Sequence, residues 1–392
     1  MPSVVSLKRT RDYDPEAVTR AIRECLAPLG GIGAVVRPGQ TVLLKPNLLA
    51  GYAPERAVTT HPSVVRAAIL LVQEAGGRAI VGDSPGVGAL SSVAKTCGIA
   101  AVLAETGAQL ADCERAVDFD APKNTVAKRL TLVKAVADAD VLITLPKLKT
   151  HGHMTMTGAL KNQFGLIPGK LKAQWHFRLQ RPEWLAELIL DIHRVVRPRL
   201  AIMDAVVGME GQGPTGGRPR QLGFFLAGHD LAAVDTLACH LIGLDPRVVP
   251  TLEAARRRGA GATSIAELQI AGDDWRGLCQ PGFQKISKLD DLLRIVPLPM
   301  GLLRWIREQW TLRPTIQAGR CTGCGICADG CPVSPSAIRP AAAAGGEIDE
   351  ARCIRCYCCH EFCPNQAISL ERSRFLRRLR PLARFATPSV RR

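Results

Sequence analysis

Eight of the 14 cysteines in the sequence lie near its end, in two copies of one pattern. Each copy reads C-x2-C-x2-C-x3-C-P, the spacing with which bacterial ferredoxins hold two [4Fe–4S] clusters. In those ferredoxins the fourth cysteine of each run binds the other cluster. We therefore predict one [4Fe–4S] cluster on Cys321, Cys324, Cys327 and Cys363, and a second on Cys353, Cys356, Cys359 and Cys331.

Other uses of clustered cysteines fit the sequence less well. Disulfide frameworks are typical of small secreted domains, whereas this chain has 392 residues and no recognisable secretory signal. Zinc sites usually pair two C-x2-C units, which does not explain three cysteines and a Cys-Pro in each copy. Both copies also continue to an Ala-Ile pair, with two more residues before the first pair, at Ala337-Ile338 and Ala367-Ile368. Such an internal repeat is what a ferredoxin with pseudo-twofold symmetry requires.

Six cysteines lie outside the pattern. Cys358 directly precedes a predicted ligand, and it is interpreted either as a packed bystander or as an alternative ligand. The others are scattered among apolar residues, where a free cysteine behaves as a small buried hydrophobe. We therefore assign no chemistry to Cys25, Cys97, Cys113, Cys239 and Cys279.

A second group of reactive side chains lies in the stretch LPKLKTHGHMTMTGALKNQFG, residues 145–165. Lysine and histidine together suit anion binding, proton donation, or both. A helix beginning near Thr157 would add backbone N–H groups for an anion. A solvated basic loop is the alternative. The candidate catalytic residues are Lys147, Lys149, His151, His153 and Lys161.

The elements that must position these residues alternate along the first 290 or so residues. Apolar strand-like runs separated by amphipathic helices predict an α/β fold with a mainly parallel sheet covered on both faces. In such sheets, ligands bind outside the carboxyl ends of the strands. Polar loops follow several predicted strands, and they supply the candidate substrate-binding residues Lys45, Asn47, Asp83, Ser84, Asn162 and Asp204. An ordinary strand-end lysine or a capped turn stays open as the alternative at each position.

The segment GQGPTG, residues 211–216, matches G-x-G-x-x-G literally. The dinucleotide fingerprint requires its glycines to open a helix directly after a strand. Pro214 and the following GRPR favour a flexible loop, so we predict no NAD site. A mobile flap over the site is one interpretation of this loop.

Length and composition predict a domain at 1–296, a linker with an amphipathic helix at 297–314, a small ferredoxin-type α+β domain at 315–370 and a basic tail at 371–392. The tail holds eight arginines and one glutamate, so it carries +7 of the net charge of +16. It is interpreted as a membrane-surface contact, a disordered tail or a packed segment; we do not expect nucleic acid as a partner. The absence of a long apolar run, together with oxygen-sensitive clusters, predicts a cytoplasmic protein.

Several motifs together resemble one family. LLKPNLL, GDSPG, LPKLKTH with TGALKNQFG, and DAVVGMEGQGP are similar to the domain-of-unknown-function family numbered 362, and CIRCYCCHEFCP is similar to its members with a fused two-cluster ferredoxin. The resemblance covers roughly residues 3–370. It implies an α/β domain, two iron–sulfur clusters and no settled reaction.

Two functions from different classes follow. In the first, the protein is a reductase that passes electrons through its clusters to an anionic substrate in the α/β domain. In the second, it is a non-catalytic electron carrier or assembly module for a partner redox enzyme. The expected partners are a redox protein or a small-molecule electron acceptor. A third possibility, structural clusters beside non-redox chemistry, ranks last because two clusters are a costly way to brace a fold.

Overall fold

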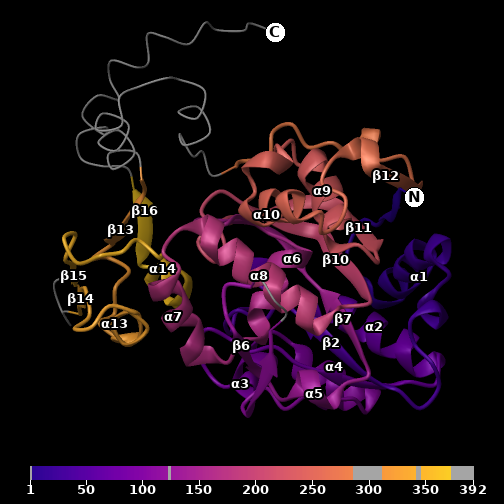
Figure 1. Cartoon of the computed structure of the whole chain (residues 1–392), viewed down its shortest axis with the longest axis horizontal. Helices are drawn as coiled ribbons and strands as arrows, with labels where there is room; N and C mark the ends of the chain where they lie inside the picture. Colours follow the sequence, from indigo (N-terminus) through magenta and orange to yellow (C-terminus); the bar gives the residue numbers. More distant parts are fainter. Residues whose placement is uncertain (1, 122–124, 286–310, 341–345, 372–392) are drawn as a thin grey trace, which may run out of the picture. The chain divides into compact units, whose positions relative to one another are not determined.

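The computed structural model forms two compact units (Figure 1) and describes residues 2–121, 125–285, 311–340 and 346–371. The first unit, Met1–Lys285, is called the α/β unit, and the second, Ile286–Arg392, the ferredoxin unit. Two predicted segments lie outside the described residues. They are the amphipathic helix of the linker, as far as residue 310, and the basic tail beyond residue 371.

A mainly parallel sheet forms the centre of the α/β unit. Its strands follow the order β12-β1-β11-β10-β7-β2-β3-β4, and the β8–β9 hairpin joins it through β10. Among these strands, β11 runs antiparallel to β1 and β10, and β9 runs antiparallel to β8. The bounds are β1 (Ser3–Arg9), β2 (Thr41–Pro46), β3 (Arg78–Val81), β4 (Gln109–Leu110), β7 (Val141–Leu145), β8 (Lys147–His151), β9 (Thr155–Thr157), β10 (Leu200–Glu210), β11 (Arg218–Gly228) and β12 (Leu268–Gly272).

Helices pack on this sheet in two groups, which confirms the predicted α/β class (Figure 1). One group contains α1, α2 and α4, and the other contains α6, α8, α9 and α10. A separate antiparallel pair is formed by β5 (Ala116–Asp120) and β6 (Arg129–Val133). The helix bounds are α1 (Pro15–Leu26), α2 (Pro62–Glu74), α3 (Leu90–Thr96), α4 (Ile99–Thr106), α5 (Ala135–Asp138), α6 (Ala159–Asn162), α7 (Gly169–Arg178), α8 (Pro182–Val196), α9 (Leu231–Leu241) and α10 (Pro250–Arg258).

The local sequence explains why these elements form where they do. Every residue of β2 and β7 is buried, as expected for parallel strands that are covered on both faces. Helix α2 begins at a proline, whose fixed φ suits the first helical position, and the His61 ring accepts a hydrogen bond from the Ser63 N–H at 3.2 Å. Helix α9 is capped by Asp230, whose carboxylate accepts from the N–H groups of Ala232 and Ala233.

The stretch after β7 is a strand rather than the loop that the sequence suggested. Pro146 separates β7 from β8, and β10 is long enough to pair with both, first with β7 and then with β8 through the register Asp204↔Lys147 and Met209↔Lys149. Asp204 therefore lies inside β10 and not at a strand end. All five residues of β8 are buried, so the alternative of a solvated basic loop is wrong.

The ferredoxin unit repeats one arrangement twice. In each half a strand leads into a cysteine run, then a short helix, then a second strand. The outer strands of the two halves pair with each other, the inner strands do the same, and the two helices are in contact. The elements are β13 (Arg313–Ile316), α13 (Ile326–Asp329), β14 (Ile338–Arg339), β15 (Glu347–Ile348), α14 (Cys358–Phe362) and β16 (Ile368–Glu371).

Two glycines of the TGALKNQFG motif leave room for buried carboxylates. A Cβ at Gly158 would overlap the Asp235 carboxylate, which accepts hydrogen bonds from Ala159 N and Leu160 N at the start of α6. A Cβ at Gly165 would overlap the Asp83 carboxylate and would lie 2.6 Å from Lys45 Nζ. The glycines in this motif are therefore needed for close packing.

We expect Gly165→Ala to lower the free energy of unfolding by about 1–3 kcal/mol, because overpacking must displace an ion pair that is fixed in the core. Urea unfolding followed by circular dichroism measures the change. Gly33→Ala is the matched control, since a Cβ at Gly33 would meet no atom within 4 Å. Equal midpoints for the two variants would contradict the packing role of Gly165.

Candidate functional site

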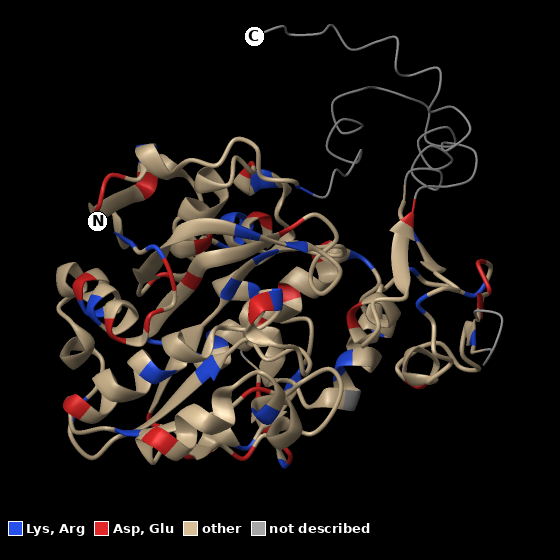
Figure 2. Cartoon of the chain, turned by 180° about the vertical axis from the view of Figure 1, so that it is seen from behind, with Lys and Arg blue, Asp and Glu red and all other residues tan. Residues whose placement is uncertain are grey.

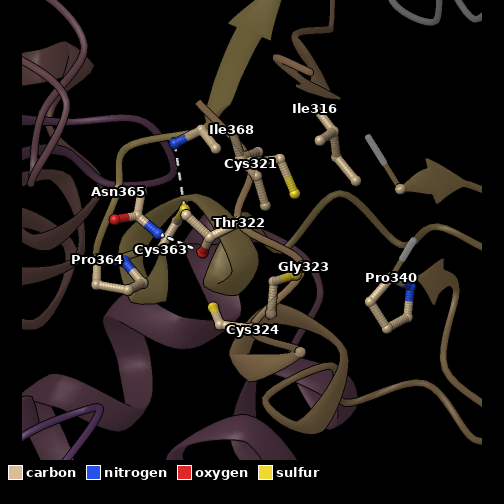
Figure 3. Close-up of a pocket in the computed structure, with 14 residues that line it drawn as sticks. Ile316, Cys321, Thr322, Gly323, Cys324, Pro340, Cys363, Pro364, Asn365 and Ile368 are labelled. Carbon is tan, nitrogen blue, oxygen red and sulfur yellow. Dashed lines mark hydrogen bonds between the residues drawn. The ribbon is translucent and has the colours of Figure 1, made fainter. Parts of the chain in front are cut away.

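Four of the predicted cluster ligands line one cavity in the ferredoxin unit (Figure 3). Cys321, Cys324 and Cys327 come from the first run, whereas Cys363 comes from the end of the second run. Most of the other lining residues are small or apolar, among them Gly323 and Ile316, and Asn365 is a polar exception. This is the set of thiols predicted for the first cluster, brought together from two parts of the chain.

The other four thiols form a second group around Cys353 and Cys356. Burial raises the pKa of the Cys353 thiol, and Cys356 and Cys331 raise it further. Burial also raises the pKa of the Cys359 thiol well above its usual range, and Cys356 and Cys353 add to that effect. Cys331 from the first run thus lies beside the thiols of the second run. Neighbouring thiols that resist deprotonation can all become thiolates when a metal supplies compensating positive charge.

Each of the two groups of thiols contains a sulfur atom that takes part in a hydrogen bond. The Ala367 N–H donates to Cys363 Sγ at 3.1 Å, and such bonds influence the reduction potential of a cluster. The Cys358 side chain is buried, and its hydrogen bond to Cys356 lowers the pKa of the Cys356 thiol. Cys358 is therefore a packed neighbour of a predicted ligand.

Within the part of the chain that the structure describes, no three His, Cys, Asp or Glu side chains are close enough together to hold a single metal ion. A cubane of four iron and four sulfur atoms is wider than one ion, so its thiolates stand farther apart than the 2.3 Å Zn–S bonds of a zinc site require. The residues present fit such a cluster by the chemistry of their donors, which are all thiols.

The α/β unit buries an ion pair next to two asparagines. Lys45 Nζ lies 2.8 Å from Asp83 Oδ1, and both side chains are almost completely shielded from solvent. Asp83 also accepts hydrogen bonds from the N–H groups of Leu48 and Ser84. Asn162 Oδ1 accepts from Lys45 Nζ at 3.3 Å and from Asn47 Nδ2 at 3.2 Å. Five of the six residues predicted to bind substrate, the Ser84 backbone included, therefore form one hydrogen-bonded group.

The sixth, Asp204, belongs to a second buried ion pair. Lys147 Nζ lies 2.9 Å from Asp204 Oδ2 and 2.7 Å from the hydroxyl of Tyr13. Tyr13 donates to Asp204 Oδ1 at 2.7 Å, and its ring stacks on His61 with centroids 3.6 Å apart. Burial raises the pKa of Tyr13 well above its usual range, and Asp204 raises it further. Burial lowers the pKa of Lys147, an effect that Asp204 opposes.

The remaining predicted catalytic residues follow along β8 and into α6. Lys149 Nζ donates to the carbonyl of Val58 at 2.5 Å and is 1% exposed. His151 Nδ1 accepts from the N–H groups of His153 and Met154, so a neutral ring carries its proton on Nε2. Burial lowers the pKa of His151 well below its usual range, and the charge of Lys161 lowers it further. We call the two ion pairs and these residues the basic site. Figure 2 shows that Lys and Arg positions occur on strands inside the α/β unit as well as on its surface.

Two expectations about nearby backbone groups are wrong. The N–H groups at the start of α6 do not await an anion, because Asp235 already accepts from them. The GQGPTG segment is attached to β8: Gly213 N donates to Thr150 Oγ1 at 3.2 Å, and Gly152 N donates to the Gly213 carbonyl at 3.1 Å. A Cβ at Gly213 would overlap Thr150, so this loop is packed and is not a mobile flap.

Four residues of the site were missed by sequence reasoning. Tyr13 and His61 lie before or between predicted elements, and nothing in their local sequence indicates a partner 191 or 143 residues away. Lys172 and His176 on α7 are one helical turn apart and both are buried. Their i, i+4 spacing is the one signal in the sequence that could have linked them.

These features define a class of protein, an iron–sulfur protein with an α/β unit and a ferredoxin unit. Residues 313–371 match the family model described as a 4Fe-4S dicluster domain. Residues 42–240, half of the chain, match the family described as Domain of unknown function (DUF362). The chain belongs to the DUF362 family, which confirms the resemblance found in its motifs.

A relative from Synechocystis, called a thylakoid-associated protein, is 38% identical over 312 residues, which cover 79% of this chain and 94% of the relative. Two solved structures show a slight likeness. They are the lactate racemase apoprotein from Thermoanaerobacterium thermosaccharolyticum (12% identity, TM-score 0.37, 58% of this chain and 54% of that one) and a Thermotoga maritima protein (10%, 0.34, 55% and 56%). The chain thus spans about half the length of these structures, and such scores carry no functional argument. Among the described residues, no helix has the length and apolar character needed to cross a bilayer.

Cysteine substitutions test the cross-pairing of the two runs. We expect Cys324→Ala and Cys363→Ala to leave the same single cluster behind, and Cys331→Ala and Cys356→Ala to leave the other, each with about half of the wild-type iron. Iron and sulfide analysis and electron paramagnetic resonance of the reduced, anaerobic protein measure this. Cys279→Ala, an exposed cysteine of the α/β unit, is the control. If Cys363→Ala instead gives the spectrum of Cys356→Ala, each run holds its own cluster.

Proposed function

We propose that the protein is a reductase that delivers electrons through two [4Fe–4S] clusters to a small anionic substrate bound in the basic site. The observation that carries this proposal is the burial of three lysine side chains, Lys45, Lys147 and Lys149, each 1% exposed or less. Lysine is almost never fully buried unless it is paired. Lys45 and Lys147 each contact a carboxylate, and Lys149 donates to the main-chain carbonyl of Val58.

The charge of the site favours an anion. Buried ammonium groups attract an anion strongly, because a low-dielectric interior screens charges much less than water does. The charge of Lys161 acts in the same place, where it lowers the pKa values of His151, His176 and Lys172. A carboxylate or phosphate bound there would be held by charge-assisted hydrogen bonds.

The ferredoxin unit would supply electrons, and the basic site would supply protons. Cys327 contributes to the raised pKa of Cys359, so the two thiol groups are neighbours and electrons could pass between their clusters. Reduction of a double bond would take two electrons, one from each cluster, and two protons. A low-potential redox protein would then restore the clusters. His151 would donate the proton on its Nε2 and regain one at the same nitrogen, because its Nδ1 already accepts from two backbone N–H groups.

The test uses the full chain with chemically reduced clusters, under anaerobic conditions, and a panel of unsaturated carboxylates, 2-oxo carboxylates and phosphorylated carbonyl compounds. We expect at least one of these compounds to reoxidise the clusters. The return of the visible absorbance measures this reaction. Lys149→Met and His151→Ala should slow that reaction tenfold or more, since anion binding and proton transfer are each worth at least this much. Lys95→Met, at an exposed position on α3, is the control. Failure of every compound, or equal rates in all variants, would contradict the reductase.

The alternative is an electron carrier that serves a partner redox enzyme. Two observations favour it. The Synechocystis relative, 38% identical, is called thylakoid-associated. The tail of this chain, residues 371–392, carries eight arginines and one glutamate. A basic segment with interspersed leucine and phenylalanine is suited to an anionic membrane surface. A carrier held there would stay close to membrane-bound partners.

Membrane association is tested by flotation of the chain with lipid vesicles. We expect the full chain to bind vesicles that contain anionic lipids and not purely zwitterionic ones, and a chain that ends at residue 371 to lose most of this binding. Added salt should weaken the binding, because exposed charges are screened. Equal binding with and without the tail would exclude the tail as the anchor.

A further inference from the structure

Helix α7 turns two ionisable side chains inward and an aromatic ring outward. Lys172 is 8% exposed and His176 is 4% exposed, whereas the neighbouring Phe177 is 46% exposed. Burying an ammonium group and an imidazole while leaving a phenyl ring in water costs free energy. Leu171 and Trp175 of this helix pack against the core, so the helix turns apolar and ionisable side chains inward together. The two ionisable groups add nothing to apolar packing and are therefore expected to have a use.

The His176 ring is fixed by its neighbours but is not satisfied by them. It meets the ring of Phe164 edge-on, with centroids 5.4 Å apart, and the ring of His153 with centroids 5.7 Å apart. His176 Nδ1 is buried and has no hydrogen-bond partner among the described residues. A buried nitrogen without a partner is rare in folded proteins and indicates a missing group.

Lys172 connects α7 to the loop that follows β3. Its ammonium group donates to the carbonyl of Ser84, and the first residue of the helix, Gly169, packs beside Pro85. The charges of Asp83, Lys45 and Lys161 all influence Lys172. Helix α7 therefore contacts two parts of the basic site. Lys172 lies near the Lys45–Asp83 pair, and His176 contacts His153 in the turn between β8 and β9.

We propose that Lys172 and His176 form a second wall of the basic site and bind the oxyanion group of the substrate, a carboxylate or a phosphate. This inference rests on the proposed function and adds the substrate class and two binding residues to it. The oxyanion accepts hydrogen bonds from the Lys172 ammonium group and from the His176 ring. It also adds negative charge beside Lys161 and Lys172.

Binding of an oxyanion should be accompanied by proton uptake. The pKa of His176 is lowered to about 3 and that of Lys172 to about 8, in both cases by burial first and also by the charge of Lys161. Among the described residues, the ionisable groups that face these two side chains include Lys161, His153, Lys45, Asp83 and the Cys113 thiol. A nearby anion favours the protonated forms and raises both pKa values. Affinity should therefore increase as the pH falls from about 8.5 towards 6.5. At the higher pH the free protein must take up a proton at Lys172 in order to bind, and at the lower pH that proton is already present.

The test is isothermal titration of the full, oxidised chain with inorganic phosphate and, separately, with malonate. The two probes distinguish a phosphate site from a carboxylate site. We expect the wild type to bind at least one probe, with tighter binding at pH 6.5 than at pH 8.5. Lys172→Met and His176→Leu should each weaken that binding about tenfold or more, because each removes a hydrogen bond to a charged group. Phe177→Ala, next to His176 but exposed, is the matched control and should bind as the wild type does.

The outcomes separate this inference from the proposed function. If the wild type binds and Lys149→Met weakens binding while Lys172→Met and His176→Leu do not, the basic site stands and the role of α7 is overturned. If the wild type binds neither probe, both proposals fail. A second readout does not depend on the folding of variants: the ring ¹⁵N resonances of His176 in the wild type should shift on addition of the bound probe. Unchanged resonances at saturation would overturn the inference.

Discussion

The α/β unit is organised around lysine ammonium groups that have been removed from water. Lys45 and Lys147 each contact a carboxylate within 3 Å, and both pairs are shielded from solvent. Removing one partner of such a pair leaves an unpaired buried charge and costs about 3–5 kcal/mol. The surroundings satisfy what remains: backbone N–H groups bind Asp83, and Tyr13 and the His61 N–H bind Asp204. Glycine at 165 and the path of β8 beside β10 are consequences of closing the backbone around these pairs.

The ferredoxin unit presents the opposite electrostatic problem. Its thiols are partly or fully buried, and burial together with neighbouring sulfur raises the pKa values of Cys327, Cys353 and Cys359. Without a metal these groups would remain protonated, so the fold of the loops suits a state in which iron supplies positive charge. The α/β unit thus buries lysine ammonium groups, and the ferredoxin unit buries thiols that a metal would convert to thiolates.

How far the sequence predicts this structure depends on the range of each interaction. The cysteine runs were recognisable because a cubane needs closely spaced thiols on one loop, and the family confirms an iron–sulfur protein. The mainly parallel sheet was predictable from its continuous apolar runs. The contact of Tyr13 with Asp204 was not, since the two residues are 191 positions apart and meet only through the strand order. Nor was the burial of Lys172 and His176 on α7, because their partners lie on elements that are distant in sequence.

The two units are chemically compatible because adding electrons to an anion increases its negative charge. A site that holds such a substrate must offset both the original charge and the charge that develops during reduction, and fixed cations in a dry interior do this better than water. Burial beside Lys161 lowers the pKa values of His151 and His176. The same burial of cations is what would let the site offset negative charge. Negative charge that arrived beside these rings would raise their pKa values. In the proposed reduction, the basic site would then hold protons more readily when the substrate requires them.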